Sequence, residues 1–445
     1  MDKRLKILWR TVCVGPAIVA ALAAPAAASA ATDPLLQDQW ALSDPSMIGA
    51  PEAWTQSDGA GVVVAVLDTG VQLDHPDLAG AIWTNPNEIP GNGIDDDHDG
   101  IVDDVHGANM FTGTGNVGDD NGHGTHVAGI IAARKGNGVG GAGLAPKATI
   151  MPVKVLDSTM SGTTDTLALG IRYAVDHGAK ILNVSVNTDT QTDAVTSAVR
   201  YAGQHGAIVV ASSGNNGRDI DLVPSYPASL PDPAVMSIAA ESDDGLLWDG
   251  SNTGLTSVDL DAPGDHIVST ALGGGYQSRT GTSAAAPFVS ASLALLAAAR
   301  PDLPMSALRD AIDTTTRHSS LLSSLLGTGG RLDVGAAMHS ILSGSAWRSG
   351  AGTDAASGPS LKLRTKSKAR AGAKVKLTWT ASDAPTVAKW RVSLDGRVVG
   401  SVAADDAGVT RRIARRGHHS WRVVGFDATG AKVVAAKRTF RVVRR

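Results

Sequence analysis

The chain has 445 residues, of which 43% are hydrophobic and 18% charged, with a formal net charge of −4. These values exclude a disordered or collagen-like protein, and the length allows several domains and at least one large core. The charge is unevenly distributed. Residues 31–360 carry 14 basic and 37 acidic residues, whereas residues 361–445 carry 21 and 5. This asymmetry indicates two segments with different roles.

The N-terminal segment is typical of a secretory signal. Four basic residues within the first ten precede an apolar stretch that ends at Ala24, and Ala28-Ser29-Ala30 follows as a cleavage site. The apolar stretch is short for the alternative, an uncleaved membrane anchor. We therefore expect a signal peptide at residues 1–30 and a secreted, extracellular protein without a stable membrane span. Cys13 is the only cysteine, so the exported chain would have neither a disulfide nor a thiol nucleophile.

Between residues 61 and 301, short β-branched runs alternate with helical patterns. This alternation predicts a parallel sheet covered by helices on both faces, an α/β three-layer sandwich occupying residues 31–344. The two clearest helices are Thr164–Gly178 and Thr192–Gly206, each ending at a glycine that can cap it. The predicted strands are Val62–Leu67, Ile150–Leu156, Ile181–Val186, Ala207–Ala211 and Ala234–Ala239.

The composition changes near residue 345. Residues 345–360 are rich in Ser, Gly and Ala and are predicted to form a linker. Residues 361–445 then alternate between apolar and polar positions, which predicts a small antiparallel β-sandwich domain. Its predicted strands are Lys374–Thr380, Lys389–Leu394, Val398–Val402, Ser420–Phe426 and Lys437–Val443.

Four short segments carry residues suited to nucleophilic catalysis. Asp68 ends a predicted buried strand, and His123 stands at the start of a predicted helix. Ser283 lies on a glycine turn before an Ala-rich helix, and Asn215 follows another buried strand. A serine needs an imidazole base, the imidazole needs a carboxylate on its other nitrogen, and the oxyanion needs N–H donors. The four residue types together therefore predict acyl transfer.

These segments, Val66-Leu67-Asp68-Thr69-Gly70, Asn121–Gly129 and Gly281–Pro287, resemble the Asp, His and Ser boxes of the subtilisin-like serine peptidases, the subtilase family. The order Asp, His, Ser is the one known for subtilisins. The resemblance covers roughly residues 33–337, and the segment from Asp33 to Trp54 looks closer to the thermitase-like branch of the family. It implies that Asp68 orients the histidine, His123 is the base, Ser283 the nucleophile and Asn215 the oxyanion donor. His126, the second histidine of its box, is predicted to be structural.

The resemblance also implies the substrate-binding residues. A peptide bound as an added β-strand would lie between the segments Ser161-Gly162-Thr163 and Ser185-Val186-Asn187, with Gly214 next to the oxyanion donor. The family usually has Ser-Leu-Gly where this chain has Ser185-Val186-Asn187, so the shape of the specificity pockets differs. Only 37 residues separate the predicted cleavage site from Asp68, which leaves no room for the usual inhibitory prodomain.

Calcium is the expected cofactor. Asp95, Asp97 and Asp99 alternate before Gly100, as in the first half of a calcium loop, although His106 stands where an EF-hand has glutamate. The alternative is a solvated acidic loop. The family resemblance alone implies a second site at Asp33, Asp77 and Asn137.

We therefore predict a monomeric, secreted serine endopeptidase that acts on proteins and peptides. The alternatives are an inactive relative that serves as a binding or adhesion module, and a protease for narrow processing of surface proteins. The C-terminal domain loosely resembles Ig-like or fibronectin-III-like modules. It is interpreted either as a spacer, as a domain that docks on the acidic part of the chain, or as a domain that binds cell-envelope polymers or nucleic acid through Arg411, Arg412, Arg415 and Arg416.

Overall fold

The structure is a computed structural model. The described residues are 32–319, 322–343, 360–365, 368–370, 373–382, 389–394, 397–403, 408–413, 417–426 and 432–443. The predicted signal peptide with Cys13, most of the predicted linker, and Arg415 and Arg416 lie outside these residues. Ser360, the last predicted linker residue, already belongs to a strand.

A nine-stranded sheet forms the centre of the larger unit. Its strands lie in the order β10-β11-β7-β6-β5-β4-β1-β3-β2, and every pair except β10–β11 is parallel. The five strands expected from the sequence are present to within two residues. The strands are β1 Val63–Asp68, β2 Ala108–Asn109, β3 Thr149–Lys154, β4 Ile181–Val184, β5 Ile208–Ser212, β6 Val235–Glu241, β7 Leu260–Pro263, β10 Arg317–His318 and β11 Gly330–Arg331.

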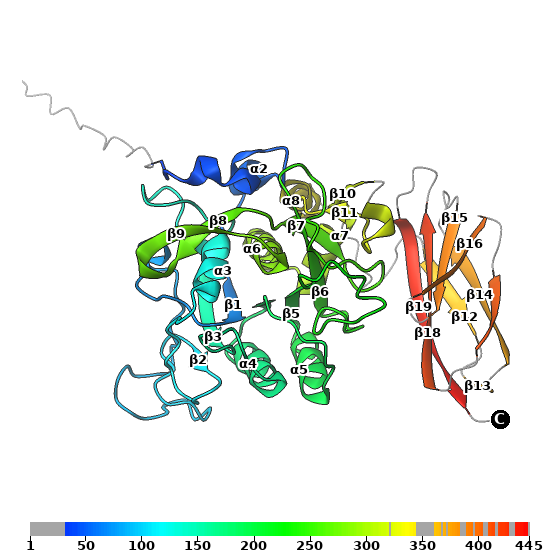
Figure 1. Cartoon of the computed structure of the whole chain (residues 1–445), viewed down its shortest axis with the longest axis horizontal. Coiled ribbons are helices and arrows are strands. Elements are labelled where there is room, and N and C mark those ends of the chain that lie inside the picture. Colours follow the sequence, from blue (N-terminus) through cyan, green and yellow to red (C-terminus); the bar gives the residue numbers. More distant parts are fainter. Residues whose placement is uncertain are drawn as a thin grey trace, which may run out of the picture.

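Helices cover both faces of this sheet, which confirms the predicted α/β sandwich. Helices α3 and α6 lie on one face, and α4 and α5 lie on the other (Figure 1). A hairpin of β8 (Ile267–Ala271) and β9 (Gly275–Arg279) extends beside α3. The helices are α1 Trp40–Ser43, α2 Ala50–Trp54, α3 His123–Ala132, α4 Thr164–Asp176, α5 Asp193–Gln204, α6 Thr282–Ala299, α7 Met305–Thr315 and α8 Val334–Ser343.

The strands consist of continuous runs of apolar residues because both of their faces are buried. In β1, Val64 and Val66 contribute to the core under α3 and α6, whereas Ala65 and Leu67 contribute to the core under α4 and α5. Helix α6 is apolar all round and would be long enough to cross a bilayer, but most of it is buried inside this unit. The carboxyl ends of the parallel strands meet at one edge, where sites form in such sheets.

The described C-terminal residues form a three-stranded sheet, β12-β14-β17, and a five-stranded sheet, β13-β19-β18-β15-β16. Both sheets contribute to one apolar core that includes Trp379, Trp390 and Trp421, so they form a sandwich. The pairing is antiparallel as predicted, except that β13 runs parallel to β19. The strands are β12 Ser360–Arg364, β13 Lys368–Arg370, β14 Lys374–Ser382, β15 Lys389–Leu394, β16 Arg397–Ala403, β17 Gly408–Arg412, β18 Gly417–Phe426 and β19 Lys432–Val443.

Candidate active site

Asp68 and His123 meet at the carboxyl edge of the sheet. Asp68 is the last residue of β1, and His123 is the first residue of α3. The Nδ1 atom of His123 lies 2.8 and 2.9 Å from the two carboxylate oxygens of Asp68. Both side chains are buried. Since a carboxylate only accepts hydrogen bonds, Nδ1 carries the proton and Nε2 of the neutral ring is free to act as a base.

The surroundings of the two histidines in α3 change their pKa values in opposite directions. Burial alone lowers the pKa of His123, but the charge and hydrogen bond of Asp68 outweigh burial, so the pKa lies above its usual 6.5. Burial and the nearby Arg279 lower the pKa of His126 to about 3. The Nε2 atom of His126 lies 3.1 Å from the carbonyl oxygen of Ile267. His126 is thus neutral and tied to the backbone, which agrees with a structural role.

Asp119 fixes the start of α3, and sequence reasoning did not single it out. Its carboxylate accepts hydrogen bonds from the N–H groups of Asn121, Gly122 and Thr125, at 2.8–3.0 Å, and from two hydroxyls. Burial raises the pKa of Asp119, but these hydrogen bonds more than offset burial, so its pKa is lowered. An anion at a helix N-terminus is also favoured by the helix dipole. The carboxylate therefore positions the turn that carries His123.

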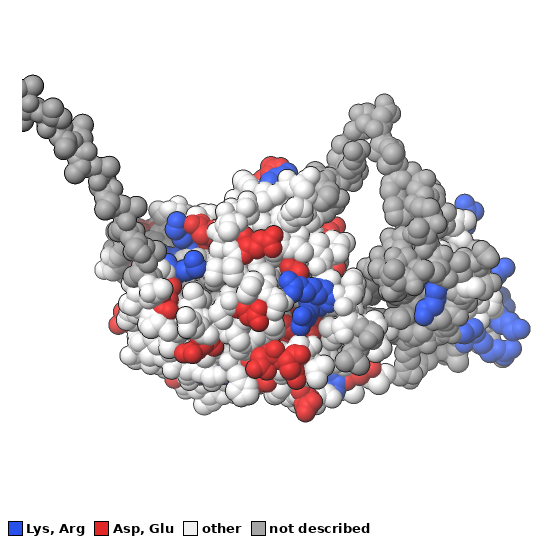
Figure 2. Space-filling model, turned by 90° about the horizontal axis from the view of Figure 1, so that it is seen from above, with Lys and Arg blue, Asp and Glu red and all other residues white. Residues whose placement is uncertain are grey.

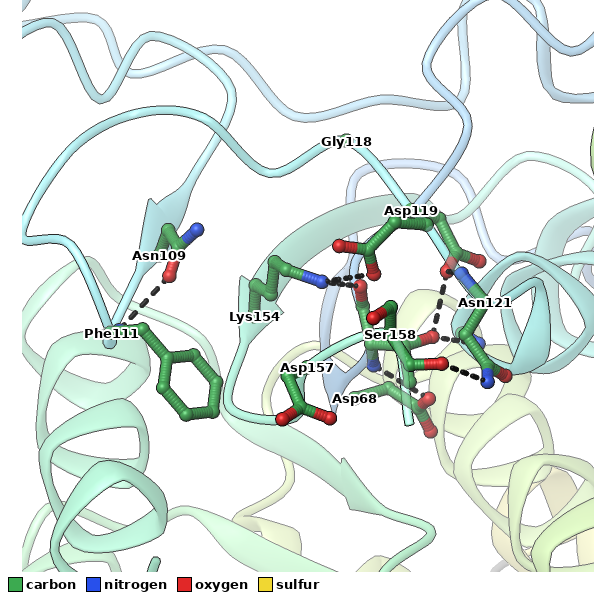
Figure 3. Close-up of polar contacts among 12 residues, drawn as sticks. Asp68, Asn109, Phe111, Gly118, Asp119, Asn121, Lys154, Asp157 and Ser158 are labelled. Atoms are coloured by element: carbon green, nitrogen blue, oxygen red, sulfur yellow. Dashed lines mark hydrogen bonds and ion pairs between the residues drawn. The ribbon is translucent and has the colours of Figure 1, made fainter. Parts of the chain in front are cut away.

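Lys154, the last residue of β3, is a second positioning residue near Asp68. In Figure 3, Lys154 and Asn121 lie on opposite sides of Asp119. The Nζ atom of Lys154 donates to the carbonyl oxygen of Thr69 at 2.5 Å and to Asp120 at 2.7 Å. Lys154 is buried, so its ammonium holds the backbone that follows Asp68 in place. A lysine ending an otherwise apolar strand is the sequence signal that could have revealed it.

Ser283 is the second residue of α6 and follows a glycine turn. Gly281 has φ +152°, and a Cβ atom at this position would lie 3.1 Å from Nδ2 of Asn215 and 3.4 Å from Oγ of Ser283. The amide of Asn215 and the hydroxyl of Ser283 therefore face the same small volume. The hydroxyl of Ser185 donates to the carbonyl oxygen of Ser283 at 2.9 Å and fixes this first turn.

The amide of Asn215 is oriented by its neighbour Thr282. Its Oδ1 atom accepts hydrogen bonds from the backbone N–H of Thr282 at 2.9 Å and from its hydroxyl at 2.8 Å. The same hydroxyl accepts from the N–H of Gly214 at 3.1 Å. Because Oδ1 is occupied, the NH₂ group of Asn215 is left to donate toward the cleft.

A cleft of about 380 Å³ is lined by residues that the sequence predicted to be catalytic or substrate-binding. It is lined by His123, Ser283 and Asn215, and also by Ser161, Gly162, Thr163, Ser185, Val186 and Asn187. The two predicted substrate-binding segments therefore meet around the same cleft. Gly214, which precedes Asn215, has φ +107°, and a Cβ atom there would approach the amides of Asn252 and Asn187 within 2.5 Å. Gly214 is not among the residues that line the cleft, and its substrate-binding role stays a prediction.

Asp33, Asp77 and Asn137 lie together next to the N-terminus of the described chain. The carboxylate of Asp33 accepts the N–H groups of residues 136–138 at 2.7–3.1 Å, and Asp77 accepts the amide of Asn137 at 2.8 Å. Burial raises the pKa of Asp77. Two buried carboxylates and an amide are a hard oxygen donor set that fits calcium. The amide oxygen of Asn137 accepts from Val139 and would have to turn toward an ion.

The acidic loop between β1 and β2 also gathers its carboxylates. Oxygen atoms of Asp95, Asp97 and Glu88 lie within 4.8 Å of one another, and a second such group is formed by Asp97, Asp104 and His177. The Oδ1 atom of Asp99 accepts from Ile101, and burial raises the pKa of Asp99 to about 6. Sequence reasoning missed three of these residues because they lie outside the Asp-x-Asp-x-Asp pattern: Glu88, Asp104 and His177.

Comparison with known proteins agrees with this arrangement. The model of the subtilase family of peptidases matches residues 59–329. Thermitase of Thermoactinomyces vulgaris is 37% identical over 258 residues, which cover 57% of this chain and 81% of thermitase. An intracellular serine protease of Paenibacillus polymyxa is 38% identical over 253 residues, covering 56% and 71%. A cell wall-associated protease of Bacillus subtilis is 40% identical over 261 residues, covering 59% of this chain and 26% of that protein.

The parallel α/β sandwich, the cleft at its carboxyl edge and these relatives define the chain as a serine peptidase. Because the family model matches more than half of its length, the chain belongs to the subtilase family. It has thermitase-like relatives, as the segment before β1 predicted.

Proposed function

We propose that the chain is a secreted endopeptidase that hydrolyses internal peptide bonds of proteins through an acyl-enzyme. In this proposal Asp68, His123 and Ser283 form the catalytic triad, and Asn215 is an oxyanion donor. One observation carries it: His123, Ser283 and Asn215 line the same cleft, while Asp68 holds the far nitrogen of His123 at 2.8 Å. Export rests on the predicted signal peptide, since the names of the relatives include both a cell wall-associated and an intracellular protease.

In the proposed mechanism, Nε2 of His123 takes the proton of Ser283 as Oγ attacks the carbonyl carbon of the substrate. The developing oxyanion accepts hydrogen bonds from the NH₂ group of Asn215 and from the backbone N–H of Ser283 at the start of α6. The imidazolium then protonates the leaving amine, and a water molecule hydrolyses the ester. Since the base must be neutral, activity should fall as the pH drops below the raised pKa of His123.

The substrate would lie as an added strand between the two segments that line the cleft. At Gly162, a Cβ atom would lie 2.4 Å from the carbonyl oxygen of Val155. Only glycine therefore allows the backbone of this segment to pass so close to Val155. Ser185 is tied to the carbonyl of Ser283, which links the substrate strand to the nucleophile. The carbonyl groups of the two segments would accept the N–H groups of the peptide.

The experiment that tests this function compares casein hydrolysis by the wild type and by Ser283→Ala. Loss of the nucleophile should lower the rate about 10⁶-fold, the size found for subtilisin, a family member. The melting temperature of the variant should match that of the wild type. Equal hydrolysis by both proteins would contradict the proposal. A folded wild type that hydrolyses neither casein nor peptides would favour the alternative, an inactive binding module.

We also propose calcium as a structural cofactor, held by Asp33, Asp77 and Asn137 and, in the acidic loop, by Asp95, Asp97 and Asp99. Calcium would neutralise clustered carboxylates and stabilise an exported chain that has no disulfide. If the ion is present at a hundred times its Kd, it adds roughly 3 kcal/mol to the free energy of unfolding. The melting temperature of Ser283→Ala should therefore fall on chelation and recover with Ca²⁺. An unchanged value would contradict a calcium role.

For the C-terminal domain, we propose attachment to anionic polymers. Among the described residues of this domain, Figure 2 shows Lys and Arg side chains at the surface. Lys374 lies directly opposite Arg412 on β14 and β17, and both are exposed, as are Lys376 and Arg364. Like charges opposite each other destabilise a sheet unless an anion offsets them. Ser283→Ala should therefore bind immobilised polyphosphate at low salt, and Lys374→Gln with Arg412→Gln should weaken binding. No retention of Ser283→Ala at low salt would favour a spacer, and equal retention of both proteins would contradict the role of Lys374 and Arg412.

A further inference from the structure

The part of the cleft next to the oxyanion donor lies between the continuations of two neighbouring strands. β4 and β5 are parallel neighbours in the sheet, and the chain continues from them as residues 185–188 and 212–215. The N–H of Thr188 donates to the carbonyl oxygen of Tyr226 at 2.9 Å, and the N–H of Tyr226 donates back at 2.8 Å. This bridge fixes the first segment relative to the chain that follows β5. The cleft residues from the two segments are Ser185, Val186, Asn187, Thr188, Ser212 and Asn215.

Two polar side chains of these segments point to the same side of the sheet. Successive residues of a strand face opposite sides, and in β5 they contribute in turn to the core under α3 and α6 and to the core under α4 and α5. This alternation directs Ser212 to the side of α6, the helix that carries Ser283. In the other segment, the hydroxyl of Ser185 bonds to α6 and Val186 packs against the opposite core. Asn187, the next residue, therefore faces α6 as well.

The amide of Asn187 reaches across to the second segment. A Cβ atom at Gly214 would lie 2.5 Å from Nδ2 of Asn187, so this amide packs against the backbone of the residue before Asn215. In the proposed mechanism, Asn215 binds the oxygen of the scissile carbonyl. The side chain of the residue that supplies this carbonyl, the P1 residue, is attached to the carbon next to it. The P1 side chain therefore meets Asn187 as it enters the space between the two segments.

Two polar groups in this space are available to a P1 side chain. The hydroxyl of Ser185 is occupied, because it donates to the backbone of α6 at 2.9 Å. The hydroxyl of Thr188 accepts a backbone N–H at 3.1 Å. In contrast, neither the amide of Asn187 nor the hydroxyl of Ser212 has a hydrogen-bond partner among the described residues, although Ser212 is only 2% exposed. A buried hydroxyl without a partner is costly unless a ligand satisfies it.

The same space offers no charged group to a substrate. Among the described residues that line the cleft, none is Lys, Arg, Asp or Glu. Asp189, just beyond the lining, forms an ion pair with Arg218, which compensates its charge. A charged P1 side chain would thus lose its water without gaining a counter-ion. A large apolar one would cover Asn187 and Ser212 and leave both without partners.

We propose that Asn187 and Ser212 form a polar P1 subsite, and that the enzyme cleaves peptide bonds after Asn and Gln in preference to those after Leu and Phe. This inference rests on the proposed endopeptidase function and adds its substrate class. A P1 amide can both donate to and accept from the amide of Asn187 and the hydroxyl of Ser212. A site that hydrogen-bonds its substrate discriminates strongly against analogues without such groups, because its own polar groups are then left unpaired.

The competing explanation is that Asn187 turns into solvent when a substrate binds. Its side chain is exposed, so a change of rotamer would empty the space between the two segments. A large apolar P1 side chain would then fit against the backbone of both segments. The hydroxyl of Ser212 opposes this alternative, because an apolar side chain would cover it without replacing the hydrogen bond.

The test measures kcat/KM for peptides that share one sequence and carry Gln, Asn, Leu or Phe at P1. Asn187→Leu keeps a side chain of similar size without hydrogen-bonding groups, and Ser212→Ala removes only the hydroxyl. Thr190→Ala is the matched control, because Thr190 is an exposed residue of the same loop outside the cleft lining. The rate of labelling by a small fluorophosphonate reports on the nucleophile separately, since this reagent has no P1 side chain.

We expect the wild type and Thr190→Ala to prefer Gln and Asn over Leu and Phe. Each of the other two variants should lower the ratio of kcat/KM for Gln over Leu by roughly two- to tenfold, the contribution of one hydrogen bond. A wild type that prefers Leu or Phe, or a ratio that is equal in all four proteins, would overturn the proposal. A wild type that reacts with neither the peptides nor the fluorophosphonate would contradict the peptidase function itself, on which the inference rests.

Discussion

Three buried carboxylates in strands of the central sheet, Asp68 on one side and the pair Glu241 and Asp261 on the other, differ in their partners. Asp68 at the end of β1 is hydrogen-bonded to His123 and to the N–H of Thr69. Glu241 at the end of β6 and Asp261 in β7 are equally buried, yet their carboxylate oxygens have no hydrogen-bond partner in the described part of the chain. The carboxylate of Asp68 is satisfied by its partners, whereas burial of the second pair lowers the stability of the fold.

The difference also appears in the pKa values. Burial, opposed only in part by Arg331 at 3.7 Å, raises the pKa of Glu241 to about 7. Burial and the charge of Glu241 raise the pKa of Asp261 well above its usual value. Near neutral pH the pair therefore retains protons that the unfolded chain would release. Buried carboxylates thus act according to their partners and not to their burial alone.

The largest expected effect comes from changing Asp68. Asp68→Asn preserves the shape of the side chain but removes the charge that holds the proton on Nδ1 of His123. We expect kcat to fall about 10⁴-fold, as for the same change in another serine peptidase, with little change in melting temperature. The measurement is hydrolysis of a peptide substrate at pH 8. A loss of less than tenfold would show that Asp68 does not orient the base.

The next largest expected effect is the dependence of kcat/KM on pH. Because the pKa of His123 is raised above 6.5, the base is protonated over a wider range than a free imidazole. The value of kcat/KM should fall tenfold per pH unit below that raised pKa. Asp68→Asn should shift the midpoint to lower pH, because it removes the charge that favours the imidazolium. A midpoint that stays unchanged in Asp68→Asn would contradict the assignment.

Removing the second pair should change stability and leave activity intact. A carboxyl whose pKa is raised in the folded state destabilises the fold increasingly as the pH rises from its ordinary value through the raised one. Asp261→Asn should therefore increase the free energy of unfolding by roughly 1–3 kcal/mol at pH 8, and by less at pH 5. Urea unfolding at both pH values measures this. Equal gains at the two pH values, or a destabilised protein at pH 8, would refute the explanation.

The sequence predicted the regular parts of the fold and nine of the residues that line the cleft. The apolar runs of β1 and β4 and the glycine-capped α4 and α5 were recognisable because local pattern determines them. The residues that support the site could not be recognised in the same way. Asp119 and Lys154 lie in no motif, and their roles arise only where β3 and the start of α3 come together. His177 joins the acidic loop from 73 residues beyond Asp104, a contact that no local pattern reveals.

The central claim is that folding makes the hydroxyl of Ser283 the nucleophile. The most direct measurement is reaction of the wild type with a fluorophosphonate at pH 8, followed by peptide mapping by mass spectrometry. We predict a single adduct on Ser283 that is absent from His123→Ala, since a serine hydroxyl without its base is a poor nucleophile. An adduct on another residue, or labelling of His123→Ala at the wild-type rate, would contradict the account.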